Sequence, residues 1–206
     1  MKILNFLKKI LDNPIIFNLF ETLMGVNKTR RVLVKDYIKP SYNCRILDIG
    51  CGTGDFRKFL PENIDYIGID NNPEYIEYAK SKKYKNSNFI CTESNQIDFL
   101  KNKKFDIILS IGVIHHLNNN LFKELVDKSY SLLSDNGYLL TYDPVYIKNQ
   151  NFISKFLIDN DRGNFVRNEN DYISKIKNLF PKILSFQVNN LQNLPYDVII
   201  IKAFKK

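Results

Sequence analysis

An apolar run that ends in closely spaced glycines is the strongest chemical signal in the sequence. Residues 46–54, Ile-Leu-Asp-Ile-Gly-Cys-Gly-Thr-Gly, predict a buried strand, a tight turn and the start of a helix. Gly50 and Gly52 allow the backbone to approach a ligand where a side chain would collide with it. The start of a helix presents unpaired N–H groups and partial positive charge, which suit a phosphate or a carboxylate. We therefore expect this turn, including Asp48 and Cys51, to line a ligand site.

Polar residues at the ends of the next two predicted strands extend this site. Asp70 lies 20 residues after Gly50 and is followed by Asn71. A carboxylate in that place can accept hydrogen bonds from both hydroxyls of a ribose. Glu93 and Ser94 end the following strand, where Glu93 can accept a bond from an adenine amino group. Because open α/β sheets bind ligands at the carboxyl ends of their strands, these residues together predict a nucleoside site.

A fourth apolar strand ends beside two histidines. Residues 105–112 place Ser110 and Gly112 at its carboxyl end, where the glycine lets the chain pass close to a ligand. His115 and His116, the two histidines of the chain, follow directly. Either histidine is a candidate base or a group that orients a substrate. The alternative is that they cap the next helix or pack beneath it.

Four further residues are candidates for contact with a second substrate. Asp143 ends the fifth predicted strand, where it can bind a hydroxyl or an amine, or serve only as a turn residue before a proline. Tyr146 follows it on the same rim. Arg162 and Arg167 lie in a compact polar segment and can clamp a carboxylate or phosphate. A solvated loop with ordinary surface pairs explains the two arginines equally well.

Short apolar runs alternate with amphipathic stretches around these residues, which predicts a mostly parallel sheet with helices on both faces. Two strands near the end are joined by a link too short for a crossover helix, so the last strand should be antiparallel to its neighbour. The expected strands are 45–49, 66–70, 88–91, 105–110, 138–142, 183–188 and 197–204, and the expected helices are 55–60, 73–82, 95–100 and 119–133.

The first 40 residues lack this alternation of strands and helices. Helical spacing of apolar residues predicts helices at 3–11, from 14 to about 25, and at 28–38, which together form an N-terminal helical cap. A basic amphipathic helix at a membrane surface is the alternative for the first of them. We expect one domain over 1–206: the cap at 1–40, a ligand-binding core at 41–146, and a substrate-side insertion with the final strand pair at 147–206.

Composition narrows the partners and the compartment. The net charge is +8, from 30 basic and 22 acidic residues, but the excess is mostly scattered lysine without clustered arginine and aromatic residues, so nucleic acid is not an expected partner. The cysteines, Cys44, Cys51 and Cys91, form no CxxC pair and no Cys/His metal spacing, so no metal site is expected. Their odd number fits a reducing compartment, and no run of about 18 apolar residues appears. We expect a cytoplasmic protein, as a monomer or a homodimer.

Four segments occur in a familiar order: LDIGCGTG at 47–54, GID at 68–70, FDIILSIGVIHHL at 105–117 and LLSDNGYLLTYDP at 132–144. Over residues 40–145 the chain resembles the class I S-adenosylmethionine-dependent methyltransferases. The resemblance implies an α/β fold: a Rossmann-like, doubly wound, seven-stranded sheet with an antiparallel last strand. It implies S-adenosylmethionine as the cofactor. Where such enzymes often carry Gly-Asp before the adenine contact, this chain has Thr92-Glu93.

The resemblance also implies roles for individual residues. Asp48, Gly50 and Gly52 would line the methionine part of the cofactor. Asp70 would hold the ribose, and Glu93 and Ser94 would border the adenine. A methyl group on a positive sulfur is already activated, so the protein must mainly align the acceptor and exclude water. A base is needed only where the acceptor loses a proton.

The expected function is methyl transfer to a small molecule, at oxygen or nitrogen, with a sugar or an acidic metabolite as the candidate acceptor. A catalytically inert subunit that binds S-adenosylmethionine and an RNA methyltransferase are the alternatives. A short-chain reductase is disfavoured, because the Tyr78 and Lys82 pair follows the second strand and the glycine spacing is not that of a dinucleotide site. Methylation of a nucleobase amine is disfavoured, because Asp-Pro-Val-Tyr at 143–146 follows the fifth strand and not the fourth.

Overall fold

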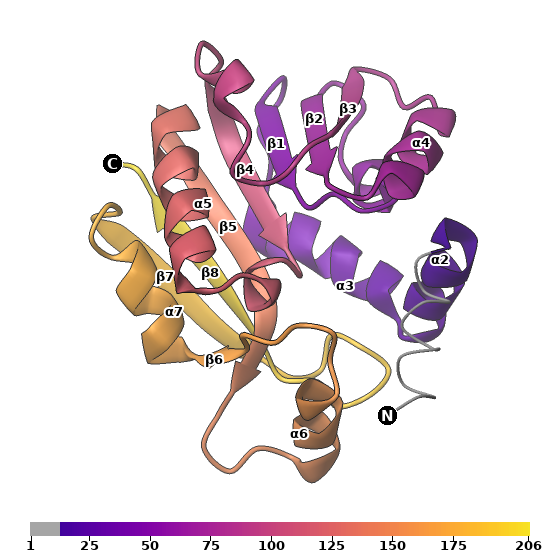
Figure 1. The fold of residues 1–206 in the computed structure, drawn as a ribbon, viewed down its shortest axis with the longest axis vertical. Helices are drawn as coiled ribbons and strands as arrows, with labels where there is room; N and C mark the ends of the chain where they lie inside the picture. The colour runs from indigo at the N-terminus through magenta and orange to yellow at the C-terminus, as the bar shows by residue number, and fades with distance from the viewer. Residues whose placement is uncertain (1–12) are drawn as a thin grey trace.

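A twisted sheet runs through the protein, and the computed structural model describes it over residues 13–206 (Figure 1). Its strands follow the order β3-β2-β1-β4-β5-β8-β7, with the two-residue β6 paired to β5 beside this path. The first five strands are parallel, and β8 is antiparallel to both β5 and β7. The strands are β1 (Arg45–Ile49), β2 (Asp65–Asp70), β3 (Ser87–Cys91), β4 (Phe105–Ile111), β5 (Leu133–Tyr146), β6 (Arg167–Asn168), β7 (Lys182–Val188) and β8 (Val198–Phe204).

The predicted fold class is confirmed, and the antiparallel last strand with it. The central strands are continuous apolar runs because helices cover both faces of the sheet. In β8, Ile199, Ile200 and Ile201 are all fully buried. Strand β7 lies at the sheet edge, and its residues alternate between half-buried and exposed, as expected for a strand with one solvated face.

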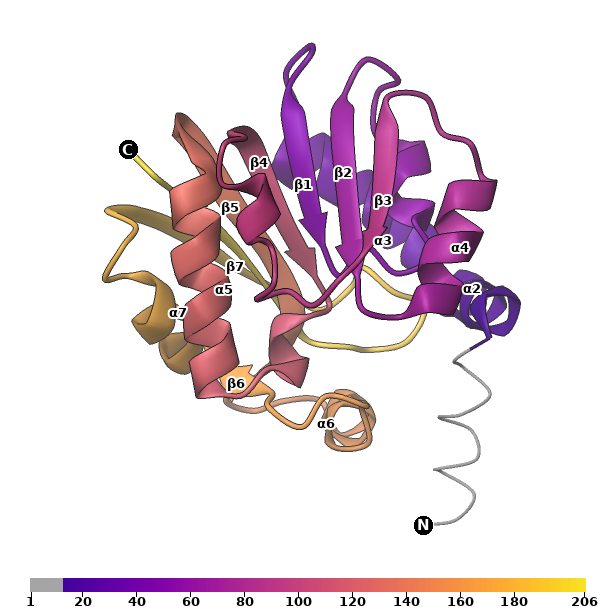
Figure 2. The same cartoon turned by 45° about the horizontal axis from the view of Figure 1, so that its top comes forward.

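Helices cover the two faces of the sheet in separate groups (Figures 1 and 2). On one face, α5 (Asn119–Leu132) and α7 (Glu169–Ile176) pack Phe122 and Tyr172 over the strands. On the other, α4 (Pro73–Ser81) and the π-helical segment Leu33–Ile38 contribute their apolar side chains to a second core. The sheet is therefore doubly wound.

The described residues also form helices α2 (Pro14–Leu23), α3 (Val26–Val32) and α6 (Phe152–Asp159), and a 3₁₀ turn, Ile114–His116, follows β4. The second predicted helix is confirmed in α2, whereas the third divides into α3 and the π-helical turn after it. The first, at 3–11, lies outside the described residues. Across residues 13–206, no helix has the length and apolar character that crossing a membrane requires.

Local capping explains where the helices begin. The side chain of Asn72 accepts hydrogen bonds from the N–H groups of Glu74 and Tyr75, and Pro73 occupies the first helical position of α4. Asn118 caps α5 in the same way. The helices predicted at 55–60 and 95–100 are instead short 3₁₀ turns, Asp55–Phe59 and Asp98–Leu100.

Strand β5 is longer than predicted. The residues before Tyr138 include Asn136 and Gly137, a pair typical of turns, but the strand continues through them with a register shift against β4. A side chain at Gly137 would lie 2.9 Å from the carbonyl oxygen of Phe105, so the glycine permits this close pairing. The turn signal therefore marks an irregularity within the strand.

Candidate active site

A cavity of about 1070 Å³ opens at the carboxyl ends of the parallel strands. In Figure 2 the arrowheads of β1, β2 and β4 point to this edge of the sheet, with α2 and α6 beyond it. Most of the residues predicted from the sequence line this cavity: Asp48, Gly50, Cys51, Gly52, Asp70, Asn71, Glu93, Ser94, Gly112, His115, His116 and Arg162. Four predicted residues lie outside its lining: Ser110, Asp143, Tyr146 and Arg167.

The glycine turn after β1 has the backbone conformation that its sequence predicts. Gly50 and Gly52 have φ values of 75° and 54°, which favour glycine. A side chain at Gly50 would collide with Val113, 2.3 Å away, whereas one at Gly52 would meet no atom within 4 Å. Gly50 is therefore fixed by packing, and Gly52 leaves open space in front of its backbone for a ligand.

The Asp70 carboxylate is held in place by the same turn. Its Oδ2 accepts a hydrogen bond from the N–H of Gly52, and its Oδ1 accepts one from the N–H of Asn72, both at 2.9 Å. Burial raises the pKa of Asp70, while these two hydrogen bonds act in the opposite direction. Each carboxylate oxygen keeps a further lone pair. The pair of oxygens is thus arranged to accept from two neighbouring hydroxyls.

Asp48 lies deeper in the cavity and is only 2 % exposed. The hydroxyl of Tyr66 donates to its Oδ2 at 2.5 Å. Burial raises the pKa of Asp48 to about 6, although the Tyr66 hydrogen bond and the charge of Arg30 lower it. Asp48 is therefore a buried carboxylate that a cationic ligand would stabilise in its charged form.

The third strand contributes the outer end of the cavity. Glu93 is exposed, and the side-chain amide of Asn71 donates to both of its oxygens at 3.3 and 3.4 Å. Ser94 is half-buried beside it. The predicted contacts from the second and third strands therefore lie together at one end of the cavity.

His115 is buried at the opposite side of the cavity, between two carboxylates. Its Nδ1 lies 2.8 Å from Asp143 Oδ1, and its Nε2 lies 3.2 Å from Asp161 Oδ1. Burial alone would lower the pKa of His115, but the hydrogen bonds and charges of the two carboxylates outweigh it and raise the pKa to about 9. The same interaction lowers the pKa of Asp161, against the effect of its burial. His115 is thus an imidazolium at neutral pH, which cannot accept a proton.

Asp143 does not lie at the cavity rim, where the sequence placed it. It is 1 % exposed and sits behind His115, whose backbone N–H also donates to its Oδ1 at 3.1 Å. Its other oxygen has no hydrogen-bond partner among the described residues. Asp143 therefore orients His115 and does not face a substrate.

The two arginines of the predicted clamp separate. Arg162 lines the cavity, with its guanidinium over the ring of Phe17. Arg167 is 9 % exposed, and its guanidinium donates to the carbonyls of Ile114, Leu117 and Phe165. These donors bind backbone carbonyls of the protein itself, so they are not available to bind an acidic substrate. Arg167 instead stabilises the turn that carries the histidines.

The remaining two predicted residues also lie away from the cavity lining. Tyr146 is exposed, and its hydroxyl donates to Asp159 at 3.0 Å. Ser110 is fully buried within β4, and its hydroxyl has no partner among the described residues. Neither side chain contributes to the wall of the cavity.

Comparison with known proteins identifies the family. A family model described as a methyltransferase domain matches residues 40–180, more than half of the chain. The chain belongs to the class I S-adenosylmethionine-dependent methyltransferases. This methyltransferase domain is 35 % identical over 132 residues to the ubiquinone biosynthesis O-methyltransferase of Pelagibacter ubique, covering 58 % of this chain and 54 % of that protein. It is 29 % identical over 152 residues to alpha N-terminal protein methyltransferase 1 of Dictyostelium discoideum, covering 68 % and 53 %. The chain thus spans about half the length of these two curated relatives.

Solved structures share the fold of this methyltransferase domain. The N-methyltransferase NodS of Bradyrhizobium japonicum, in complex with S-adenosyl-L-homocysteine, matches with a TM-score of 0.64 and 18 % identity over 87 % of this chain and 84 % of that one. The [4+2]-cyclase SpnF matches with a TM-score of 0.70 and 14 % identity over 86 % and 80 %. At these identities the likeness concerns the fold alone.

Sequence reasoning missed several residues of the methyltransferase site. Asp161 sits beside His115 only because the segment after α6 folds back over the turn after β4. Tyr66 could have been predicted as the partner of Asp48. It pairs with Ile46 in the parallel register, and Ile46 and Asp48 point to the same face of their strand. Residues from the cap carried no local signal; those on the cavity wall include Phe17, Glu21, Thr29 and Arg30.

Proposed function

We propose that this domain binds S-adenosylmethionine in the cavity and transfers its methyl group to an oxygen or a nitrogen atom of a small molecule. The observation that carries the proposal is the convergence of the glycine turn and Asp70 on one cavity, joined by the hydrogen bond from Gly52 to Asp70. The family match agrees with it.

The residues present fit the cofactor. Open space in front of Gly52 admits the methionine end against the backbone. The lone pairs left on Asp70 suit the two ribose hydroxyls, and Glu93 with Ser94 borders the adenine. Two carboxylates, Asp48 and Asp70, favour a ligand that carries a positive charge. When bound, the cofactor supplies a methyl group on a positively charged sulfur.

The opposite side of the cavity suits an acceptor with an apolar part and a polar end. Small-molecule sites typically measure about 300–1,000 Å³, and this cavity of about 1070 Å³ has room for a second small ligand. Leu19 and Leu23 of α2 and Leu157 of α6 add apolar surface to the cavity wall. Arg162 offers a positive charge for an acidic group on the acceptor.

His115 and His116 have different parts in this proposal. The imidazolium of His115 is held between two carboxylates, so in this proposal it helps to orient the acceptor and does not accept a proton. The ring of His116 is exposed on the cavity, 4.1 Å between centroids from that of His115. It is the better placed of the two to take a proton from an acceptor, where one must leave.

Calorimetry with S-adenosylmethionine and with S-adenosyl-L-homocysteine tests the cofactor, and a screen of metabolite extracts for methyl incorporation tests the transfer. Saturable binding of both ligands and labelling of a small molecule are expected. Absence of binding by either ligand would overturn the proposal. Binding without labelling of any acceptor would favour an inert subunit.

A further inference from the structure

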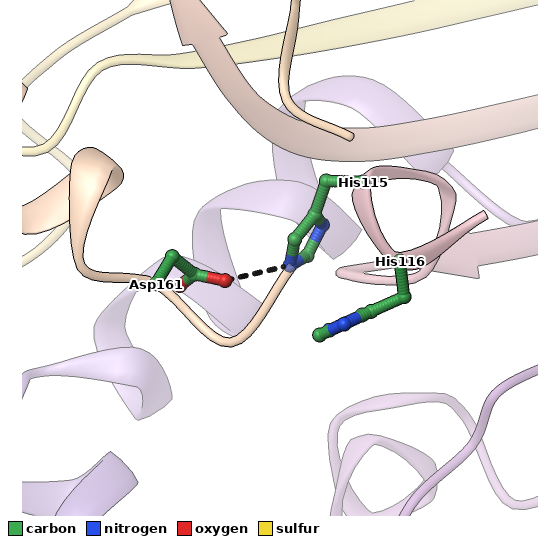
Figure 3. A group of neighbouring side chains, drawn as sticks. All are labelled: His115, His116 and Asp161. Atoms are coloured by element: carbon green, nitrogen blue, oxygen red, sulfur yellow. Dashed lines mark ion pairs between the residues drawn. The ribbon is translucent and has the colours of Figure 1, made fainter. Parts of the chain in front are cut away.

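Three side chains that could ligate a metal ion meet on the acceptor side of the cavity (Figure 3). His115 and His116 come from the 3₁₀ turn after β4, and Asp161 comes from the segment after α6. One ligand atom from each, a ring nitrogen or a carboxylate oxygen, lies within 4.8 Å of the other two. The spacing in the sequence gave no sign of this group, because Asp161 lies 45 positions after His116.

His115 has the environment of a metal ligand. Its Nδ1 is bound at 2.8 Å by Asp143, which is 1 % exposed, and metal-ligating histidines typically have such a carboxylate behind them. This contact leaves Nε2 as the atom that faces Asp161, at 3.2 Å, where a bound metal ion would take the place of the Nε2 proton. Two ligand atoms of a metal ion with bonds near 2.1 Å are separated by roughly 3.0–3.5 Å. The distance from His115 Nε2 to Asp161 Oδ1 already lies in this range.

Asp161 is oriented as firmly as His115. Its Oδ1 accepts a hydrogen bond from the N–H of Gly163 at 2.8 Å, and its Oδ2 accepts one from the hydroxyl of Tyr196 at 3.0 Å. The backbone at Gly163 packs against the His115 ring so closely that a Cβ there would lie 2.0 Å from Cδ2. Both groups are therefore preorganised by surrounding contacts.

The charge around this group is a second, independent indication. Two carboxylates, Asp143 and Asp161, contact a single imidazole. Asp143 Oδ2 is buried and, among the described residues, has no hydrogen-bond partner. Buried carboxylate oxygens are normally paired, so this unpaired oxygen behind His115 favours a positive charge at the group formed by His115, His116 and Asp161.

We propose that His115 Nε2, a ring nitrogen of His116 and an oxygen of Asp161 together bind one divalent transition-metal ion. Two imidazoles and one carboxylate favour Zn²⁺ or a similar first-row ion over Mg²⁺ and Ca²⁺, which take oxygen ligands. Three protein ligands leave coordination positions open toward the cavity, as in catalytic and not structural sites.

The chemical consequence rests on the proposed methyl transfer, although the site itself does not. An ion here would bind an acceptor hydroxyl and lower its pKa, so that the proton leaves to water and His116 acts as a metal ligand in place of a base. The oxygen lone pair then forms the bond to the methyl carbon, the carbon–sulfur bond breaks, and its electron pair stays on sulfur as a neutral thioether. The acceptor class is therefore an oxygen nucleophile, such as a phenol or hydroxy acid, with a second oxygen that can chelate.

The test is a titration of the metal-stripped full chain with Co²⁺, followed by visible absorption, and with Zn²⁺, followed by calorimetry. We expect saturable binding of one ion per chain. His116→Ala and Asp161→Asn should weaken it about 100-fold or more, and Asp143→Asn about 10- to 100-fold. Asp159→Asn is the matched control, because this exposed carboxylate lies two residues before Asp161 but outside the cavity lining. Cys91→Ser, which removes the exposed thiol, should also leave binding unchanged.

Two outcomes would overturn the site: no saturable binding of either ion, or equal affinity in the His116→Ala and Asp161→Asn variants. Using both variants guards against one that fails to fold, which circular dichroism detects. Binding of S-adenosylmethionine, measured on the same metal-stripped samples, separates the two proposals. Cofactor binding without metal binding removes only the metal site, and metal binding without cofactor binding removes only the proposed function.

Discussion

The backbone N–H of Gly52 donates a hydrogen bond to Asp70 Oδ2 at 2.9 Å, which joins the turn after β1 to the carboxylate at the end of β2. The two residues belong to neighbouring parallel strands. A change at Asp70 is therefore expected to act on the proposed cofactor site twice: through the proposed contacts with ligand hydroxyls, and through the turn that Asp70 no longer holds.

Replacing Asp70 by alanine should weaken binding of S-adenosylmethionine by about 1.5–3 kcal/mol, or about 10- to 150-fold, the scale of a hydrogen bond to a charged group. Calorimetry with the cofactor measures this directly. Asp65→Ala is the control, because Asp65 is exposed at the opposite end of the same strand. Equal affinity of wild type and Asp70→Ala would refute the ribose assignment.

Asp48 should give both stability and cofactor affinity a dependence on pH. Burial raises the pKa of Asp48 from 3.8 to about 6 in the folded state. Three neighbouring groups also act on it: the Tyr66 hydrogen bond and the charge of Arg30 lower the pKa, and the charge of Asp70 raises it. A raised pKa means that the folded chain holds a proton that the unfolded chain releases. The stabilisation is therefore present below about 4 and is lost as the pH rises through 6, with a size of about 2–3 kcal/mol.

Cofactor affinity should change in the opposite direction, because a cationic ligand favours the ionised carboxylate. We expect affinity to fall by up to about tenfold per pH unit below 6. Asp48→Asn should remove the Asp48 contribution to both dependences while it keeps an acceptor for the Tyr66 hydroxyl, and the contribution of Asp70 remains. Denaturant unfolding and calorimetry across pH 4–8 provide the measurements, with the exposed Asp65→Asn as control. A pH profile in Asp48→Asn that is the same as that of the wild type would contradict the assignment.

Replacement of Arg167 should lower the free energy of unfolding, whereas replacement of Arg162 should mainly affect use of the acceptor. Arg167→Met leaves the carbonyls of Ile114, Leu117 and Phe165 without their donor in a buried place, at a cost of about 2–4 kcal/mol in the free energy of unfolding. Arg162→Met should change that free energy by less than about 1 kcal/mol but weaken use of an acidic acceptor. Urea titrations of both variants compare the two. Equal stabilities would argue against the structural role of Arg167.

Gly163→Ala should impair the acceptor side and spare the cofactor side. A methyl group there would lie 2.0 Å from His115 Cδ2 and 2.7 Å from its carbonyl oxygen, so the segment after α6 must shift. A displacement of this size should lower kcat/KM for the acceptor about 10- to 100-fold. Binding of S-adenosyl-L-homocysteine, measured by calorimetry, should stay at the wild-type value. A parallel loss of both would show that the two sides are not separable.

Local patterns were sufficient for most of the sheet and for placing the residues that follow β1, β2 and β3 on the cavity wall. The strand over Arg45–Ile49 was predicted with its observed bounds, because a continuous apolar run followed by glycines has few alternatives. Single helical turns such as Asp98–Leu100 were predicted as longer helices, since a short amphipathic stretch does not distinguish a 3₁₀ turn from a helix.

The acceptor side required information that no local pattern holds. Whether Asp143 points to the rim or behind His115 depends on which face of β5 it occupies, and that follows from pairing with distant strands. The burial of Arg167 depends on how the segment after α6 packs on the turn after β4. The contact of His115 with Asp161 arises from the same packing.

That packing bears on how acceptor preference can be altered by segment exchange. The N–H of Phe165 donates to the carbonyl of His115 at 2.9 Å, while Asp161 and Gly163 close on the ring. A loop transplanted from a relative therefore has to bring its own partners for the histidine turn, or the recipient turn has to be exchanged with it. We expect chimaeras that move only residues 147–166 to lose turnover, and chimaeras that move 112–118 as well to retain it.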